Sequence, residues 1–403
     1  MIAVDSHNAK DPFTATGAGE RRAAYTALAV AGPVHRITLP TGDPAWLITS
    51  YHEAGQALHD PRLIKTERAL ANVGWGVLPP ELLSAVASHM LNSNPPDHTR
   101  LRRLVAAAFT RRRVEQLTPR IQQITDELLD GMAGATQVDL LESFAYPLPI
   151  TVICELIGVP AQHRSEFHAW SSVVVTGVLA GRELFISASV AMVRFMRELV
   201  AAKRAAPADD LLSALVAVRD GADRLSEDEL TSMAFLLLVA GHETTVNLIG
   251  NGVLALLTHP EQLTLLRAQP ERLGAAIEEL LRFEGPLQVA TLRVTTESIE
   301  LGGAAIPAGE IVVVGLLAAN RAAAGIAHPD ALDITRADNP HVAFGHGIHH
   351  CLGAPLARLE GRIALGSLLC RFPTLRLAVA PEELTWRPGV LMHSLAALPV
   401  TLE

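Results

Sequence analysis

The sequence predicts a mainly α-helical protein with small β-sheets. Long apolar segments with helical periodicity, separated by Pro and Gly, make up most of the 403 residues. Only three short runs are typical of strands, at residues 45–49, 299–301 and 311–314. Because 49% of the residues are hydrophobic and no repeat or linker interrupts the chain, we expect one large domain over residues 1–403. Residues 1–20 are expected to be loosely ordered.

The composition argues against several classes of protein. A formal net charge of −9 argues against a general nucleic-acid binder. Three cysteines are too few for a disulfide framework in a chain of this length, which favours a reducing compartment. The N-terminal segment carries charged and polar residues throughout and has no apolar stretch of signal or membrane-spanning length. We therefore expect a cytoplasmic monomer that binds neither nucleic acid nor membrane.

One basic segment stands out in this acidic chain. An ordinary solvated helix face and a docking surface for an acidic partner both explain such a cluster. Its members are Arg100, Arg102, Arg103, Arg111, Arg112 and Arg113.

The longest predicted helix begins after Ser226 and continues to about Thr258. Ser226 and Glu229 have the spacing of a capping box, in which each side chain bonds the backbone N–H of the other residue. The apolar run that follows corresponds to roughly 50 Å of helix at about 1.5 Å per residue. A polar patch at residues 240–245 interrupts this run, and burying such groups is costly unless they are bonded or used.

Two side chains of this patch, Glu243 and Thr244, allow a structural and a functional interpretation. In the structural one, Glu243 caps a kink and Thr244 bonds back to a carbonyl of the preceding turn. In the functional one, the carboxyl and hydroxyl groups move protons in a site otherwise kept dry. The patch itself reads Ala240-Gly241-His242-Glu243-Thr244-Thr245.

A thiol ends a glycine-containing loop at residues 344–353. An apolar helical run follows Cys351 directly, and Pro355 falls in its first turn, so the helix is predicted to begin at Leu352 or Gly353. A helix N-terminus favours a thiolate at this position. The glycines of the loop, which allow close approach of a flat ligand, are Gly345, Gly347 and Gly353.

The loop alone leaves two other interpretations open. Cys351 could be a buried structural cysteine. It could also share a zinc ion with His346, His349 and His350, although zinc sites usually draw paired ligands from two segments. The two other cysteines lie singly inside apolar runs and offer no such pair; they are Cys154 and Cys370.

Residues 344–353 resemble the cysteine loop of the cytochrome P-450 superfamily, and residues 240–245 resemble its acid–alcohol motif. The resemblance spans essentially the whole chain, with no fused reductase domain. It implies a fold in which a long central distal helix and a proximal cysteine loop enclose haem b. It also implies that Cys351 is the axial ligand of the haem iron, in a loop that includes Phe344 and Gly353.

The resemblance gives roles to further residues. It implies a local break in the distal helix, where Ala240 and Gly241 leave space over the porphyrin. Glu243 would relay protons and Thr244 would hold water and oxygen by hydrogen bonds. Four side chains would contact the haem and its propionates, the first two one helical turn apart on one face: His98, Arg102, Arg293 and His349.

The family's pattern also concerns Glu279 and Arg282, spaced i, i+3 on a helix that ends before Pro286. Such pairs are commonly solvated and contribute a few tenths of a kcal/mol, on the order of 0.3. The resemblance implies instead a buried pair that binds the meander leading from Asn320 to His341, which is a folding role.

The chain departs from the family's pattern at two places. Asn94 stands where an acidic residue is usual, which puts a local turn in doubt. Residues 322–325 replace the usual acidic and proline residues after Asn320-Arg321.

The implied activity is that of a haem-thiolate monooxygenase. Such an enzyme inserts one atom of O₂ into a C–H or C=C bond and releases the other as water, with electrons from NAD(P)H. Without a fused reductase, the electrons would come through a ferredoxin and a ferredoxin reductase. The arginine cluster would then lie on the proximal face beside Arg358 and Arg362.

The sequence as a whole looks most like those of actinobacterial members of the superfamily that tailor macrolides, other polyketides, terpenoids and sterols. Aliphatic variable segments favour a bulky apolar substrate. Two alternatives stay open: a specialised oxidase for desaturation or oxidative coupling, and a haem-based sensor or carrier, which would have no need of Glu243 and Thr244. The expected substrate segments are residues 70–91, 173–186, 236–240, 289–292 and 390–392.

Overall fold

The computed structural model forms two compact units. Unit 1 consists of Met1–Ile64, Gln122–Pro147 and Thr244–Glu403, and unit 2 of Lys65–Ile121 and Leu148–Glu243. The single domain over residues 1–403 therefore stays a prediction. The described parts are residues 12–17, 19–71, 75–219, 225–322 and 326–403.

Some expectations fall outside these described parts. They concern residues 1–11 and 18 of the segment predicted to be loosely ordered, residues 72–74 of one substrate segment, and residues 323–325 of the meander.

The main sheet of unit 1 has five strands in the order β1-β2-β8-β5-β3. Only the β2–β8 pair is parallel, with Trp46 opposite Val312. The buried side chains Ile48 and Val314 pack in one core with Leu58 of α2. The strands are β1 (Val34–Thr38), β2 (Pro44–Ile48), β3 (Leu63–Ile64), β5 (Arg293–Thr295) and β8 (Ile311–Val314).

Two smaller sheets complete the strands of unit 1. β6 (Ile299–Leu301) pairs with β7 (Ala304–Ile306). A three-stranded sheet has the order β4-β10-β9, formed by Gln137–Asp139, Pro399–Thr401 and Arg376–Leu377.

The predicted strands at 299–301 and 311–314 are confirmed, and that at 45–49 is one residue too late at each end. The other strands have two to five residues and carry little pattern of their own.

Unit 1 also contains ten helices or single helical turns within its described residues. They are α1 (Glu20–Ala31), α2 (Tyr51–His59), η3 (Leu141–Ala145), α13 (Pro260–Ala268), η6 (Pro270–Arg272), α14 (Leu273–Glu284), α15 (Leu316–Arg321), η7 (Gly347–His349), α16 (Ala354–Arg371) and η8 (Pro381–Glu383). Three helices contain a boundary between the units: α7 (Thr118–Met132), α8 (Pro147–Ile157) and α12 (Glu227–Leu257).

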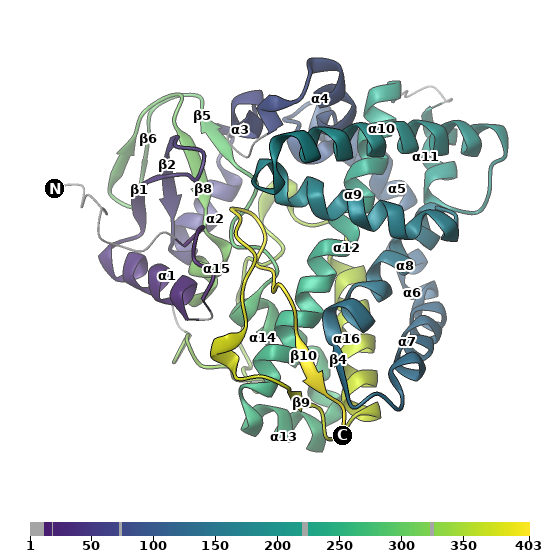
Figure 1. The fold of residues 1–403 in the computed structure, drawn as a ribbon. Helices are drawn as coiled ribbons and strands as arrows, with labels where there is room; N and C mark the ends of the chain where they lie inside the picture. Colours follow the sequence, from purple (N-terminus) through teal and green to yellow (C-terminus); the bar gives the residue numbers. More distant parts are fainter. Residues whose placement is uncertain (1–11, 18, 72–74, 220–224, 323–325) are drawn as a thin grey trace. The chain divides into compact units, whose positions relative to one another are not determined.

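In its described residues, unit 2 is helical, and its helices α9 and α10 pack side by side (Figure 1). Its remaining elements are α3 (Glu67–Ala71), η1 (Trp75–Val77), α4 (Pro80–Ala87), η2 (Met90–Asn92), α5 (Asp97–Ala108), α6 (Arg111–Gln116), η4 (Ala161–His163), α9 (Arg164–Thr176), η5 (Gly177–Ala180), α10 (Arg182–Ala205) and α11 (Leu211–Arg219).

The N-terminus of α12 is fixed by the predicted capping box. The backbone N–H of Ser226 donates to the Glu229 carboxylate at 2.7 Å, and the Glu229 N–H donates to Ser226 Oγ at 3.0 Å. The helix has 31 residues, or about 46 Å. It is long and apolar enough to cross a membrane, but 72% of its apolar window is buried inside the protein, as expected for a core helix.

A buried Glu–Arg pair organises the chain before the cysteine loop. Arg282 donates two hydrogen bonds to Glu279, at 2.7 and 2.8 Å, and both residues are fully buried. The three remaining guanidinium hydrogens bind the carbonyl groups of Pro329, Ala331 and Asn320. Glu279 also accepts from the backbone of Asp333. The predicted burial of this pair and its bonds to the meander are confirmed.

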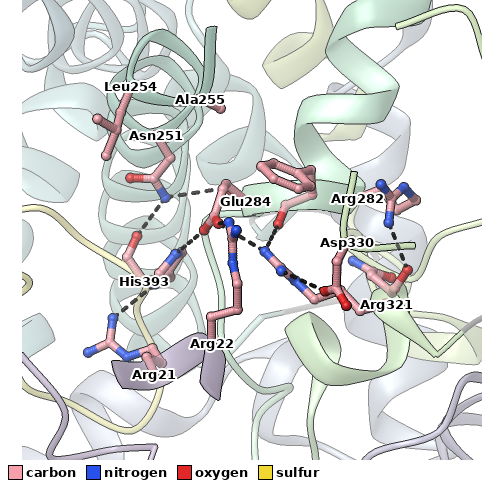
Figure 2. Close-up of polar contacts among 12 residues, drawn as sticks. Arg21, Arg22, Asn251, Leu254, Ala255, Arg282, Glu284, Arg321, Asp330 and His393 are labelled. Atoms are coloured by element: carbon pink, nitrogen blue, oxygen red, sulfur yellow. Dashed lines mark hydrogen bonds and ion pairs between the residues drawn. The ribbon is translucent and has the colours of Figure 1, made fainter. Parts of the chain in front are cut away.

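A second charged cluster ties α1, α12, α14 and α15 to the C-terminal loop (Figure 2). Glu284 accepts from Arg22 at 2.5 Å, from Arg321 at 2.9 Å and pairs with His393 at 2.6 Å. Burial would raise the pKa of Glu284, but these three neighbours hold it well below its ordinary value. Asn251 of α12 donates to the His393 carbonyl at 2.8 Å, so the loop is anchored to the helix.

Replacing Arg282 by Met should lower the free energy of unfolding by about 3–5 kcal/mol, because Glu279 would stay buried without its closest cation. Denaturant unfolding followed by circular dichroism measures the change. The control is Arg194→Met, because Arg194 and Glu198 form an i, i+4 pair whose side chains are 81% and 65% exposed. That variant should lose less than about 0.5 kcal/mol. Similar small losses in both proteins would contradict the buried role.

Candidate active site

The cysteine loop of unit 1 presents an exposed thiol at the start of a helix. Cys351 is exposed, and its N–H donates to the Phe344 carbonyl at 2.9 Å, which closes the loop. Helix α16 begins at Ala354, one or two residues later than predicted, because Gly353 is its N-cap. Pro355 lies in the first turn, as expected. The thiol therefore faces a helix N-terminus rather than a packed core.

Two glycines of the loop have backbone conformations that other residues rarely adopt. Gly345 and Gly347 both have φ of +70°. At Gly347 a side chain is also excluded by space, because a Cβ would lie 2.6 Å from the carbonyl oxygen of Leu58 on α2. The ring of His346 meets that of His59 edge-on at 4.2 Å. Helix α2 thus packs directly against the cysteine loop at Gly347 and His346.

A cation lies close to the thiol. The Arg358 guanidinium lies 4.4 Å from the centre of the Phe344 ring and donates two hydrogen bonds to Glu278, at 2.7 and 2.8 Å. Bonding to Glu278 raises the pKa of Arg358, burial opposes this, and negative charge at Cys351 raises it further. The same interaction, seen from the sulfur, favours the thiolate at Cys351.

Glu278 is held ionised by the hydrogen bonds that it accepts from Arg358 and His341. Burial would raise its pKa, but hydrogen bonds from Arg358 and His341 bring it down to about 2. His341 and Glu278 are 3.0 Å apart. The network keeps Arg358 charged and in place beside Phe344.

Arg293 of β5 is a buried cation that needs an anion. Its exposed fraction is 3%, and it donates a hydrogen bond to the Thr291 carbonyl at 3.3 Å. Among the residues that the structure describes, no carboxylate forms an ion pair with it, and burial lowers its pKa to about 10. A buried guanidinium of this kind fits the carboxylate of a ligand such as haem. His349, in η7, is partly buried.

In unit 2, α5 carries His98 and Arg102 one turn apart, as predicted. His98 is buried and Arg102 is partly buried. The turn before α5 is held by Asn94, whose amide oxygen accepts from the Lys65 N–H and whose amide nitrogen donates to the Lys65 carbonyl, both at 2.8 Å. Asn94 therefore holds the turn although it is not the usual acidic residue, because an amide group can accept one of these hydrogen bonds and donate the other.

The predicted break in the long helix is not observed as an interruption. Helix α12 is continuous from Glu227 to Leu257, so this expectation was wrong. The patch is accommodated instead by close packing, because a Cβ on Gly241 would lie 2.8 Å from the Ile153 side chain on α8. Glu243 is only 4% exposed.

One stripe of α12 is left incompletely covered. Ala240 is exposed, although it lies in the middle of a core helix. Leu237, Gly241 and Thr244 are partly buried, and all four positions follow the i, i+3, i+4, i+7 spacing of one helix face. An open face of small residues is what a flat ligand beside this helix requires.

His242 is a polar residue to which the sequence interpretation gave no role. It is fully buried and forms hydrogen bonds with Leu238 and with Ser171 of α9. The signal in the sequence was a titratable side chain inside an apolar run. Its partner on another helix could not be identified from spacing.

Neither alternative for the cysteine loop is supported by the described residues. Cys351 is exposed, unlike the buried Cys154, so it is not a packed core cysteine. In the described part of the chain, no group of three or more His, Cys, Asp and Glu side chains could hold a metal ion.

Comparisons with known proteins agree with this geometry. The family model of cytochrome P450 matches residues 182–397. The chain is 55% identical to cytochrome P450 107B1 of Saccharopolyspora erythraea over 377 residues, covering 91% of this chain and 92% of the relative. It is 47% identical to the vitamin D(3) 25-hydroxylase of Pseudonocardia autotrophica, covering 97% and 96%. The tirandamycin C-bound P450 monooxygenase TamI superposes with a TM-score of 0.88 at 47% identity, covering 94% and 96%.

The fold and the site thus define a haem-dependent monooxygenase, which takes O₂, electrons from a redox partner and a small-molecule substrate. The chain belongs to the cytochrome P450 family.

Replacing Gly347 by Ala should destabilise the protein more than replacing Gly345 by Ala. Both variants force a left-handed backbone on an L-residue, which costs about 1–2 kcal/mol. Only at Gly347 does a neighbouring backbone atom have to move, since the nearest atom to a Cβ at Gly345 is 3.8 Å away. We expect an additional loss of about 1–3 kcal/mol there. Thermal unfolding of the two variants measures the difference, and equal melting temperatures would show that α2 does not restrict the loop.

Proposed function

We propose that the protein binds haem b through Cys351. The observation that carries this proposal is the exposed Cys351 thiol at the start of α16, beside the Arg358 cation. Bound haem supplies the redox chemistry that activates O₂. The buried Arg293 binds one propionate, because it has no acidic partner among the described residues. The other cofactor contacts are His98, Arg102, His349, Phe344 and Gly353.

Replacing Cys351 by Ala should abolish the Soret band of the reduced, CO-treated protein that is typical of thiolate ligation, because no other soft ligand lies in the loop. Cys154→Ala and Cys370→Ala should keep the band. Cys154 is a strict control, since burial raises the pKa of its thiol to about 12 and keeps it protonated. A band typical of histidine ligation in the unmodified protein would overturn the proposal.

Proton delivery is assigned to two neighbouring residues of α12. The Thr244 hydroxyl holds O₂ and a water molecule by hydrogen bonds, and Glu243 hands protons to that water. Glu243 is almost completely buried, so the carboxyl group acts in a dry environment. Ala240 and Gly241 leave the space that the cofactor needs.

Replacing Thr244 by Ala should divert electrons into hydrogen peroxide while haem and substrate binding stay nearly unchanged, because the hydroxyl moves protons and does not build the pocket. Product formed per NAD(P)H consumed should fall about tenfold or more. The measurement pairs product analysis with a peroxide assay. Unchanged coupling would favour the structural interpretation of the patch, and with it a sensor or carrier.

The substrate is proposed to be a bulky apolar small molecule that is hydroxylated or epoxidised. The relatives named for vitamin D(3) hydroxylation and for tirandamycin C binding support this class. The C-terminal substrate segment 390–392 lies in a loop with a fixed position, because Gln288 donates to the carbonyl groups of Gly389 and Met392. Desaturation or oxidative coupling would use the same pocket and remains the second candidate.

Electrons are proposed to come from NAD(P)H through a ferredoxin reductase and a ferredoxin that docks on the basic segment of unit 2. Three of its arginines already pair with acids of the same unit or segment: Arg100 with Glu229, Arg111 with Glu115 and Arg113 with Asp209. Arg103 and Arg112 are exposed. Arg103 also lines an open groove with Pro95, Pro96, Thr99 and Arg100.

We propose further that the protein is a cytoplasmic monomer.

Replacing Arg103 and Arg112 together by Glu should slow reduction by an acidic ferredoxin and weaken its dependence on salt, because the attraction between exposed charges is screened beyond about 8 Å at physiological ionic strength. Substrate affinity should not change. Stopped-flow reduction at several ionic strengths, with a substrate titration as the control, tests both expectations. Salt-independent reduction that the double substitution leaves unimpaired would assign these arginines to a solvated helix face.

A further inference from the structure

A buried side-chain network in unit 2 links α12 to α9. His242 Nδ1 lies 2.7 Å from the Leu238 carbonyl oxygen, and His242 Nε2 lies 3.1 Å from Ser171 Oγ. His242 and Ser171 are fully buried, and the Phe167 ring packs edge-on against the imidazole with centroids 5.7 Å apart. The imidazole therefore has one fixed position.

The same ring reaches the proposed proton donor. His242 Nε2 lies 3.6 Å from Glu243 Oε1, and the Glu243 side chain is 5% exposed. Residues adjacent in a helix normally point about 100° apart. Here the imidazole edge and the carboxylate nevertheless come within ion-pair distance, with none of the His242 side chain exposed.

The hydrogen bonds accommodate two protonation states of the ring. Nδ1 must carry a hydrogen in both, because the Leu238 carbonyl only accepts. In the neutral ring, the Ser171 hydroxyl donates to Nε2. In the cationic ring, Nε2–H donates to Ser171 Oγ, and the hydroxyl hydrogen turns to the His168 carbonyl, which lies 3.0 Å from Ser171 Oγ. Ser171 therefore follows the proton on His242 by rotating one hydroxyl group.

We propose that His242 is a positioning residue that exchanges a proton with Glu243, and that Ser171 is the hydroxyl switch that stabilises both states. The inference rests on the proposed role of Glu243 and extends it. An imidazolium beside a carboxylate and a neutral imidazole beside a carboxylic acid both carry zero net charge. Transfer of the proton within the pair therefore leaves no uncompensated buried charge in either state.

His242 Nε2 gives its proton to Glu243 Oε1, the Ser171 hydroxyl turns to the free Nε2 lone pair, and Glu243 then hands a proton to the water held by Thr244. Glu243, whose side chain is 5% exposed, then takes up one proton from solvent and passes it to His242 Nε2, which restores the cationic ring. No electron is transferred within this network.

Three substitutions test the network in the haem-loaded protein. His242→Gln keeps a polar side chain of similar reach but cannot take up a proton. Ser171→Ala removes the switch and leaves His242 in place, and Ser171→Thr restores the hydroxyl. The matched control is Ser189→Ala, because Ser189 is also a buried serine whose hydroxyl binds a carbonyl of its own helix, that of Phe185 at 2.8 Å.

We expect His242→Gln and Ser171→Ala to lower product formed per NAD(P)H about tenfold, below the hundredfold or more that a directly acting acid contributes. Ser171→Thr should recover most of the coupling, and Ser189→Ala should not change it. If Thr244→Ala uncouples turnover and His242→Gln does not, the proposed function stands and the inference falls. Failure of Cys351→Ala to change the Soret band would instead remove the proposed function itself.

A second measurement does not depend on turnover. The side-chain ¹⁵N resonances of His242, assigned with His242→Gln in the diamagnetic reduced CO form, report the protonation of each ring nitrogen. Ser171→Ala should shift the Nε2 resonance and leave Nδ1 protonated, while Ser189→Ala should shift neither. An Nε2 resonance that does not respond to Ser171→Ala would overturn the hydroxyl switch, whatever the coupling.

Discussion

The burial of charge at Arg282 and Glu279 is the constraint on which the order of unit 1 depends. A guanidinium that is removed from water needs all its hydrogens bonded, and the nearby carbonyl groups of residues 329 and 331 supply what the carboxylate does not. The meander between Asn320 and His341 has little regular structure. Hydrogen bonds to this pair therefore fix its backbone, as the backbone hydrogen bonds of a sheet or helix do elsewhere. Asn320 extends the arrangement by accepting from the Val342 N–H at 2.7 Å, two residues before Phe344. The position of the cysteine loop is thus set from a helix about seventy residues earlier in the chain.

Those parts of the fold that depend on a local sequence pattern could be predicted from the sequence. The capping box of α12, the strands 299–301 and 311–314, and the spacing of His98 and Arg102 each depend on neighbours within a few residues. Short strands such as β3 could not be predicted, because two residues carry no periodicity and pair only through the tertiary fold. The start of α16 was placed early because Gly353 serves as its N-cap, a position where glycine gives only a weak signal.

The candidate site residues were predicted from motifs, whereas most of their contacts could not be predicted. Cys351, Glu243 and Thr244 follow from motifs. The partners that tune them, Glu278 for Arg358 and Ser171 for His242, lie 80 and 71 positions away in the chain, and no spacing rule connects them. The continuous α12 was also unexpected, because a glycine and a polar patch suggest a break. Tight packing of Gly241 on Ile153 and satisfied hydrogen bonds at His242 stabilise the regular helix instead.

The parallel pairing of β2 with β8 has a consequence for how the chain is made. Trp46 faces Val312, so the partner of an early strand emerges from the ribosome some 260 residues later. At roughly 5–20 residues per second, this delay is tens of seconds. During that time β1 and β2 can form only a hairpin with an unpaired, apolar edge, which is the kind of surface that attracts other strands. Unit 2, whose segments lie between residues 65 and 243, can complete its helices before the main sheet of unit 1 closes. Efficient synthesis of this protein should therefore depend on protection of its first hairpin, by chaperones or by slow growth at low temperature.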